Sequence, residues 1–115
     1  MNYANPILIC DENEEFRILI RDMLTKNGFF HILEATNANE ALEILKDRKD
    51  YLLLIEAKVL NEKLTSAVQN KKNFIIFADH SESSILKLAS KLGVEHIMSY
   101  PVHSKKLLEK INSLS

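Results

Sequence analysis

The stretch that decides the fold is residues 51–58, which read YLLLIEAK. It is the most apolar run of the chain, and it ends abruptly at the carboxylate of Glu56. A short apolar run bounded by charge is typical of a strand that is buried on both faces at the centre of a parallel sheet. Because ligands bind outside the carboxyl ends of such strands, Ile55 and Glu56 are expected where any chemistry would take place.

Strands and helices alternate on either side of this run. Apolar runs predict further strands at residues 7–10, 29–35, 74–78 and 94–99. Apolar residues at helical spacing predict a helix after each strand. The five stripes are Phe16, Leu19, Ile20, Met23 and Leu24; Ala38, Ala41, Leu42 and Leu45; Val59, Leu60, Leu64, Ala67 and Val68; Ile85, Leu88, Ala89 and Leu92; and Leu107, Leu108, Ile111 and Leu114.

This alternation predicts an α/β fold, with a parallel sheet covered by helices on both faces. The strands at 29–35 and 94–99 are mixed in polarity and are expected at the edges of the sheet. Local signals indicate where helices begin and end: Asn27-Gly28 stops the first helix, Asn37 with Glu40 caps the second, and Ser104 caps the last.

Composition sets the class of protein. The 115 residues predict one domain, residues 1–115, and the net charge of −1 gives no global electrostatic case for binding nucleic acid or a membrane. The chain has one cysteine, Cys10, which cannot form an internal disulfide, so a reducing, cytoplasmic location is expected. Because Cys10 lies in an apolar run, it is expected to be an inert small hydrophobe. No signal peptide or membrane span is predicted.

Three segments, taken together and in order, resemble response-regulator receiver domains. Residues 7–14, ILICDENE, resemble the family's first strand and its acidic pair. Residues 34–42, EATNANEAL, resemble its second strand and helix, and residues 93–102, GVEHIMSYPV, resemble the stretch before its last helix. The likeness runs from about residue 6 to 114. It implies a three-layer flavodoxin-like (βα)5 fold with strand order 2-1-3-4-5, which agrees with the alternation above.

The resemblance also implies a site, because a working receiver uses an aspartate at the end of its third strand and Mg²⁺ bound by the acidic pair. Asp11 and Glu12 match the acidic pair. Counted from Asp50, the phosphoacceptor position falls on Ile55. The other positions that the resemblance implies have also lost their usual residues: the hydroxyl of strand 4 falls on Ala78, the lysine before the proline falls on Tyr100, and the aromatic switch residue falls on Ile97.

These losses predict a degenerate pseudo-receiver: a module that signals through protein contacts independently of phosphorylation and is not an enzyme. Isoleucine has no nucleophile, alanine no hydroxyl, and tyrosine is neutral at pH 7. The alternative is an atypical receiver that is phosphorylated on Glu56, or in which the Glu56 charge mimics phosphorylation; otherwise Glu56 caps the strand end and faces solvent. A third interpretation is a small-molecule pocket lined by Ile55, Ala78 and Tyr100, which Tyr100 is expected to fill.

No cofactor is predicted, although Asp11 and Glu12 could bind Mg²⁺ weakly at a vestigial site or simply stabilise the first helix N-terminus. By analogy with the family, protein partners, or a second copy in a homodimer, are expected on the face made by helix 4, strand 5 and helix 5. Lysines give this face a basic character that would favour an acidic partner. These are Lys87, Lys91, Lys105, Lys106 and Lys110.

Overall fold

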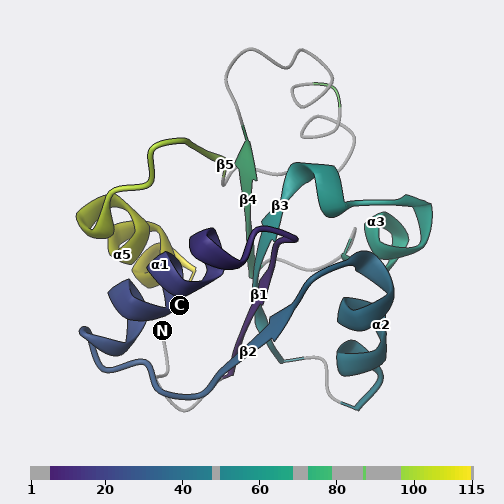
Figure 1. Ribbon diagram of the computed structural model, residues 1–115, viewed down its shortest axis with the longest axis horizontal. Helices are drawn as coiled ribbons and strands as arrows, with labels where there is room; N and C mark the ends of the chain where they lie inside the picture. The colour runs from purple at the N-terminus through teal and green to yellow at the C-terminus, as the bar shows by residue number, and fades with distance from the viewer. Residues whose placement is uncertain (1–5, 48–49, 69–72, 79–86, 88–96, 115) are drawn as a thin grey trace.

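The structure is a computed structural model that describes residues 6–47, 50–68, 73–78, 87 and 97–114. Five strands form one parallel sheet in the order β2-β1-β3-β4-β5 (Figure 1). This order confirms the predicted flavodoxin-like sheet, with the apolar run of residues 51–58 supplying its central strand and the two mixed strands its edges. The strands are β1 (Ile7–Cys10), β2 (Ile32–Ala35), β3 (Leu52–Glu56), β4 (Phe74–Ala78) and β5 (Ile97–Ser99).

Helices cover both faces of the sheet, as the alternation predicted. In Figure 1, α1 and α5 lie on one face, and α2 and α3 lie on the other. The helix predicted around Ile85 to Leu92 lies outside the described residues, apart from Lys87. No helix in the described part of the chain is long and apolar enough to cross a membrane. The helices are α1 (Glu14–Thr25), α2 (Ala38–Asp47), α3 (Glu62–Val68) and α5 (Ser104–Ser113), with a 3₁₀ turn, η1 (Ala57–Val59), after β3.

The core consists of two apolar layers, one on each face of the sheet. Alternate residues of β3 enter different layers because successive strand side chains point to opposite faces. Leu53 and Ile55 pack in the layer under α2 and α3, whereas Leu52 and Leu54 pack in the layer under α1 and α5. All five residues of β3 are buried. Burial on both faces is the reason that this strand has no polar residue before its last position.

Two of the predicted helix boundaries are formed as expected. α1 ends at Thr25, and Gly28 follows at a φ of +90°, a conformation that costs glycine little. The Asn37 side chain accepts a hydrogen bond of 2.9 Å from the backbone N–H of Glu40 at the start of α2. The Glu40 carboxylate in turn accepts from the Thr36 backbone N–H, which approximates the capping box predicted for this helix.

Other boundaries differ from the sequence prediction. Ser104 is the first residue of α5 rather than its cap, and His103 occupies the cap position without a side-chain hydrogen bond. The weak apolar pattern predicted as a helix from Val59 is divided between η1 and α3, which begins at Glu62. The division arises because Asn61 caps α3, its side chain accepting 2.9 Å from the Leu64 N–H. β2 is shorter than predicted and begins at Ile32.

Leu54→Ala and Leu19→Ala form a matched pair that tests where the core lies. Leu54 is fully buried at the centre of the sheet, whereas Leu19, which its helical spacing predicted to be buried, is 47% exposed. We expect Leu54→Ala to lower the free energy of unfolding by about 2–5 kcal/mol, since a cavity forms. We expect Leu19→Ala to change it by less than about 1 kcal/mol. Urea unfolding followed by circular dichroism measures both, and equal losses would contradict the two-layer core.

Candidate functional site

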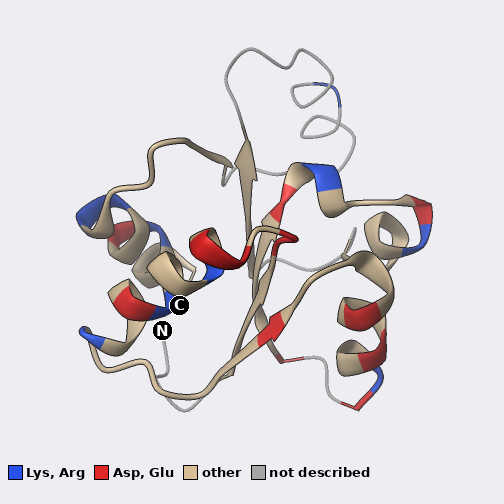
Figure 2. Cartoon of the chain, viewed as in Figure 1, with Lys and Arg blue, Asp and Glu red and all other residues tan. Residues whose placement is uncertain are grey.

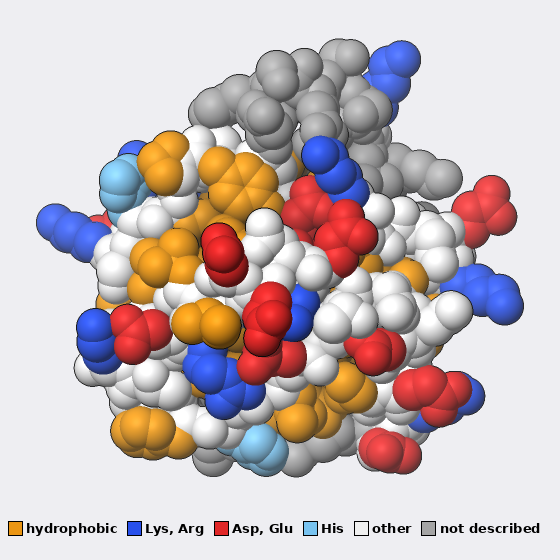
Figure 3. All heavy atoms as spheres, in the orientation of Figure 1, with side chains coloured by type: hydrophobic (Ala, Val, Ile, Leu, Met, Phe, Trp, Pro, Cys, Tyr) orange, Lys and Arg blue, Asp and Glu red, His pale blue; other side chains and the backbone are white. Residues whose placement is uncertain are grey.

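The candidate site lies at the carboxyl edge of the sheet, where β1 and β3 end side by side. Cys10 is paired with Ile55 in the ladder between these strands, and both side chains enter the α2–α3 layer. The next residue along each strand, Asp11 and Glu56, therefore leaves on the opposite side of the sheet. Figure 2 shows acidic residues at the ends of both strands. In Figure 3 acidic side chains gather over the same edge, beside a basic one.

Ile55 does not lie in this site. It is 1% exposed and packs in the α2–α3 layer with Cys10 and Ile76. The count from Asp50 assigned it the reactive position, but the register of β3 against β1 favours Glu56 as the residue beside Asp11. The reason is the alternation of the strand: a shift of one residue moves a side chain to the other face of the sheet.

Glu56 is a buried carboxylate, which contradicts the interpretation that it faces solvent. Its side chain is 8% exposed to solvent. One carboxylate oxygen, Oε2, accepts a hydrogen bond of 2.8 Å from the backbone N–H of Lys58. Glu56 thereby caps η1, so that this part of the earlier interpretation is confirmed. The Glu56 side chain thus contacts the backbone two residues further along the chain and stabilises the start of the 3₁₀ turn that follows β3.

Asp11 is also buried, at 4% exposure, whereas its neighbour Glu12 is exposed. Its Oδ1 accepts a hydrogen bond of 2.9 Å from the backbone N–H of Asn13. Burial raises the pKa of the Asp11 carboxyl above its ordinary value, and Glu12 adds to the increase. The Asn13 hydrogen bond and the Arg17 guanidinium act in the opposite direction. The acidic pair is therefore not symmetric: one member is desolvated and the other is in water.

Arg17 and Glu34 hold the loop after β1 in place, and sequence reasoning missed both. Arg17 Nη1 donates to the Asp11 carbonyl oxygen at 2.6 Å, and its Nε donates to Glu34 Oε1 at 3.0 Å. Arg21 Nε pairs with the second oxygen of Glu34 at 2.9 Å. The only sequence signal was a glutamate inside an edge strand, with two arginines four residues apart on the helix that precedes it. This network joins α1 to β2 beside the acidic edge.

The remaining predicted site residues are divided between the two faces. Ala78 is 2% exposed and lies in the α2–α3 layer with Ile55. Tyr100 packs on the α1 side, its ring centroid 5.2 Å from that of Phe16 in an edge-to-face arrangement. Phe16 makes a similar contact of 5.4 Å with Phe77, which is the β4 partner of Glu56. Ile55 and Ala78 therefore lie on the opposite face of the sheet from Tyr100, and the three do not line one common pocket. The aromatic cluster of Phe16, Phe77 and Tyr100 includes Phe77, the ladder partner of Glu56.

The thiol of Cys10, at the end of β1, is expected to be unreactive. Burial, together with the negative charges of Asp11 and Glu40, raises the pKa of its thiol to about 12. The thiol is protonated at neutral pH, and Sγ lies 3.7 Å from the Asn37 carbonyl oxygen. Because the thiolate is the reactive form, this cysteine contributes packing rather than chemistry.

The carboxylates do not fit the divalent cation that the family resemblance implies. Asp11 and Glu56 each direct an oxygen to a backbone N–H, and Glu12 is directed into solvent. Among the described residues, no group of three histidine, cysteine, aspartate or glutamate side chains is arranged to hold a metal ion. Hard cations such as Mg²⁺ need several oxygen ligands that converge on one point. We therefore derive no chemistry through a metal at this edge.

A shallow polar cleft of about 260 Å³ borders the acidic edge. Two of its side chains already cap helices: Asn37 accepts from Glu40, and Asn61 accepts from Leu64. The cleft therefore follows from the way α2 and α3 begin. Its lining residues are Glu12, Thr36, Asn37, Ala38, Asn39, Lys58, Val59 and Asn61.

The fold and this edge are similar to those of receiver domains, and comparison with known proteins supports the likeness. The chain is 27% identical to the chemotaxis protein CheY of Bacillus subtilis, over 95% of this chain and 96% of that protein. It is 25% identical to the transcriptional regulatory protein CpxR of Escherichia coli, over 96% of this chain and 49% of that protein. No family model matches the sequence.

Solved structures show the same fold. A CheY-like receiver domain of Methanospirillum hungatei superposes with a TM-score of 0.78 at 20% identity, covering 95% of this chain and 91% of that one. The relatives and the structural neighbours together support a CheY-like response-regulator receiver domain, that is, a two-component receiver domain. Receiver domains are signalling modules rather than classical enzymes.

Ile55→Asp and Glu56→Asp test which residue occupies the reactive position. Ile55→Asp places an unpaired charge in the apolar layer, so we expect it to lower the free energy of unfolding by roughly 3–5 kcal/mol. Glu56→Asp keeps the charge and a side chain suited to capping, and its expected cost is about 1 kcal/mol. Urea unfolding measures both variants. If Ile55→Asp is tolerated as well as Glu56→Asp, the register argued above is wrong.

The buried Asp11 carboxyl should make stability depend on pH. Its pKa is higher in the folded state than in the unfolded chain, so its contribution to stability decreases as pH rises from the ordinary carboxyl value through the raised one. Asp11→Asn retains the acceptor for Asn13 and removes the charge. We expect the variant to gain stability relative to the parent protein at about pH 7 but not at about pH 3, where the parent carboxyl is protonated.

Urea unfolding at the two pH values measures this difference. Glu12→Gln removes one negative charge from the same loop and reports the contribution of net charge alone. A gain for Asp11→Asn that is the same at both pH values would show that burial of the Asp11 charge does not cost stability.

Proposed function

We propose that this chain is a cytoplasmic receiver domain that lacks the phosphoacceptor aspartate and signals through protein contacts, independently of phosphorylation. The observation that carries the proposal is Glu56. The anionic side chain beside Asp11 is a glutamate, and its carboxylate is buried and accepts a hydrogen bond from Lys58 N–H. One of its oxygens is occupied by the backbone of η1, which supports a structural role for this carboxylate over a nucleophilic one.

The surroundings of Glu56 support the same conclusion. Phosphoryl transfer depends on positioned groups that neutralise the charge of the transferred phosphoryl group. Ala78 offers no hydroxyl, and Tyr100 is in contact with Phe16, where a lysine would supply a positive charge. The carboxylates of Asp11 and Glu12 are not among any group of three described side chains that could hold a metal ion, and the proposed function uses no cofactor.

The alternative is that Glu56 itself takes part, either as an atypical acceptor or as a permanent mimic of a phosphorylated aspartate. The mimic is favoured over the acceptor by one specific observation: the Glu56 carboxylate already accepts from a backbone N–H two residues further on. A negative charge at the end of β3 would then hold η1 in one conformation at all times. This alternative is also a signalling role that needs no phosphodonor.

Partners would be proteins, since nothing in the charge of this domain favours nucleic acid or a membrane. The face predicted from the family consists of helix 4, strand 5 and helix 5. Its helix 4 lies outside the described residues except for Lys87, whereas β5 and α5 are described. We propose that the part of this face formed by β5 and α5 takes part in docking, with either a protein partner or a second copy of the chain.

Treatment with acetyl phosphate and Mg²⁺, followed by intact mass measurement, tests the proposal. We expect the parent protein and Glu56→Gln to show no phosphoryl adduct, because Ile55 has no nucleophile, Ala78 has no hydroxyl and Tyr100 supplies no positive charge. The CheY protein of Bacillus subtilis, treated in parallel, tests whether the phosphodonor is active. A phosphoryl adduct on the parent protein that is absent from Glu56→Gln would overturn the proposal and establish the acceptor alternative.

A further inference from the structure

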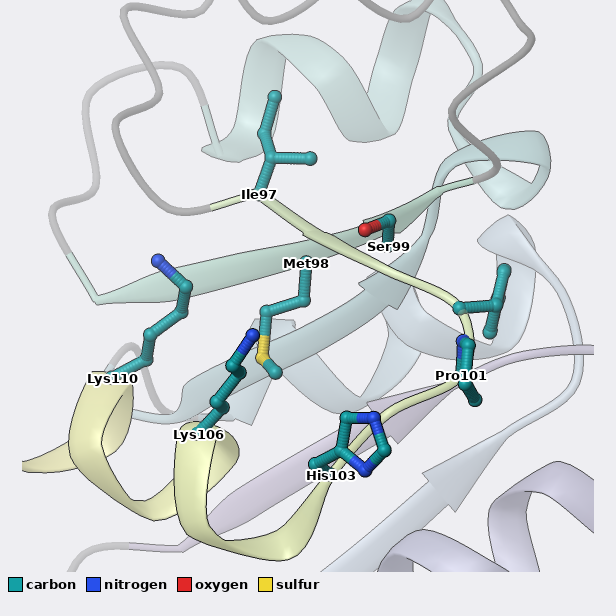
Figure 4. Close-up of a pocket in the computed structure, with 8 residues that line it drawn as sticks. Ile97, Met98, Ser99, Pro101, His103, Lys106 and Lys110 are labelled. Atoms are coloured by element: carbon teal, nitrogen blue, oxygen red, sulfur yellow. The ribbon is translucent and has the colours of Figure 1, made fainter.

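The two edges of the sheet, β2 and β5, both lie beside basic side chains of a neighbouring helix. Beside β5 there is a pocket of about 350 Å³, and Figure 4 shows Lys106 and Lys110 extending from α5 toward this strand. No aspartate or glutamate is among the residues that line this pocket, which are Ile97, Met98, Ser99, Tyr100, Pro101, His103, Lys106 and Lys110. At β2, the other edge, an arginine of α1 is hydrogen-bonded to the strand itself.

The outer edge of β2 carries backbone groups that point away from the sheet. Among the described residues, β2 has a neighbouring strand on one side only. The His31 carbonyl oxygen faces that neighbour, because it accepts a hydrogen bond of 2.9 Å from the Ile7 N–H. Successive peptide groups of a strand point in opposite directions within the sheet, so the backbone groups of Ile32 and Glu34 face outward. An outward row of this kind is a template on which another strand can pair.

Arg21 covers part of this edge. Its Nη2 donates to the Ile32 carbonyl oxygen at 3.2 Å, and its Nε donates to Glu34 Oε2 at 2.9 Å. The planar guanidinium thus binds a backbone acceptor and a side chain of β2 at the same time, which its fixed fork of donors allows. An incoming strand that is to bond with the Ile32 carbonyl has to displace Arg21 first.

The edge is otherwise suited to pairing with a second copy of the chain. Phe30, two residues before Ile32, is 75% exposed, the highest value among the large hydrophobic side chains of the described residues. Two identical edges related by a twofold axis can pair antiparallel. In the register that sets the two Ile32 residues opposite each other, Phe30 of each copy lies across from Glu34 of the other. Arg21 therefore occupies the acceptor at the centre of that pairing.

We propose that Arg21 shields the outer edge of β2 from antiparallel pairing with a second copy of the chain, and that this edge becomes a dimer interface when the Arg21 side chain is removed. β2 has only four residues, and its Glu34 carboxylate holds Arg21 against the strand. Short strands and charged side chains are two ways in which proteins protect a sheet edge. The inference goes beyond the proposed function and does not depend on it.

Amide hydrogen exchange, followed by NMR at low and at high protein concentration, tests the inference. In Arg21→Met we expect the amides of Ile32 and Glu34 to exchange roughly tenfold more slowly at high concentration, because they bond to a second copy. In the parent protein their exchange should not depend on concentration. Lys26→Met is the matched control: it removes an ion-paired cation from the same helix, where Lys26 is bound to Asp22, and should behave like the parent.

Exchange at Ile32 and Glu34 that is independent of concentration in Arg21→Met would overturn the inference. So would a concentration dependence already present in the parent protein, or an equal one in Lys26→Met. Protection confined to β5 and α5 counts against it as well, because the copies would then associate through a different face. Circular dichroism checks that the variants fold, and Arg21→Gln repeats the test with a shorter polar side chain. A phosphoryl adduct in the mass experiment bears only on the proposed function.

Discussion

The double-sided burial of β3 is the constraint on which the rest of the structure depends. Its side chains alternate between two apolar layers, Leu53 and Ile55 on one face and Leu52 and Leu54 on the other. The ladders with β1 and β4 set the register of the strand, with Cys10 opposite Ile55 and Glu56 opposite Phe77, and a slip of one residue would carry the Glu56 carboxylate to the face that packs under α2 and α3. The register therefore also decides which residue leaves the sheet beside Asp11, and that residue is Glu56.

The acidic edge is built to hold charges in place. Asp11 and Glu56 are both buried, and each gives a carboxylate oxygen to a backbone N–H of the loop that follows its strand. Arg17 joins the Asp11 loop to Glu34 on the neighbouring edge strand, so that α1, β1 and β2 are fixed together. Hydrogen bonds to ionised groups are stronger than neutral ones. One oxygen of each of these two carboxylates thereby supports the local structure of the loop that follows its strand.

The carboxyl edge of the sheet and the pocket between β5 and α5 differ in the sign of their charges. At the carboxyl edge the carboxylates of Asp11 and Glu56 accept hydrogen bonds from the backbone, and Phe16 packs edge-to-face against Phe77 and Tyr100. Between β5 and α5 the positive charges lack acidic partners within the described part of the chain and border buried Met98. A signalling domain needs a surface that another protein can recognise, and it does not need a reactive centre for that purpose.

The sequence by itself determined the fold: apolar runs and helical stripes predicted the parallel sheet, its central strand and its edges, because a continuous apolar run and a stripe of period 3.6 are both local properties of the chain. The Asn37 cap and the Gly28 stop were predictable for the same reason. Only the tertiary structure decided which side chains meet at the site. The pairing of Cys10 with Ile55 is a contact between distant segments, and no count along one strand reveals it. The Arg17–Glu34 network and the burial of Glu56 depend on how α1 and η1 pack against the sheet, which is likewise a long-range property.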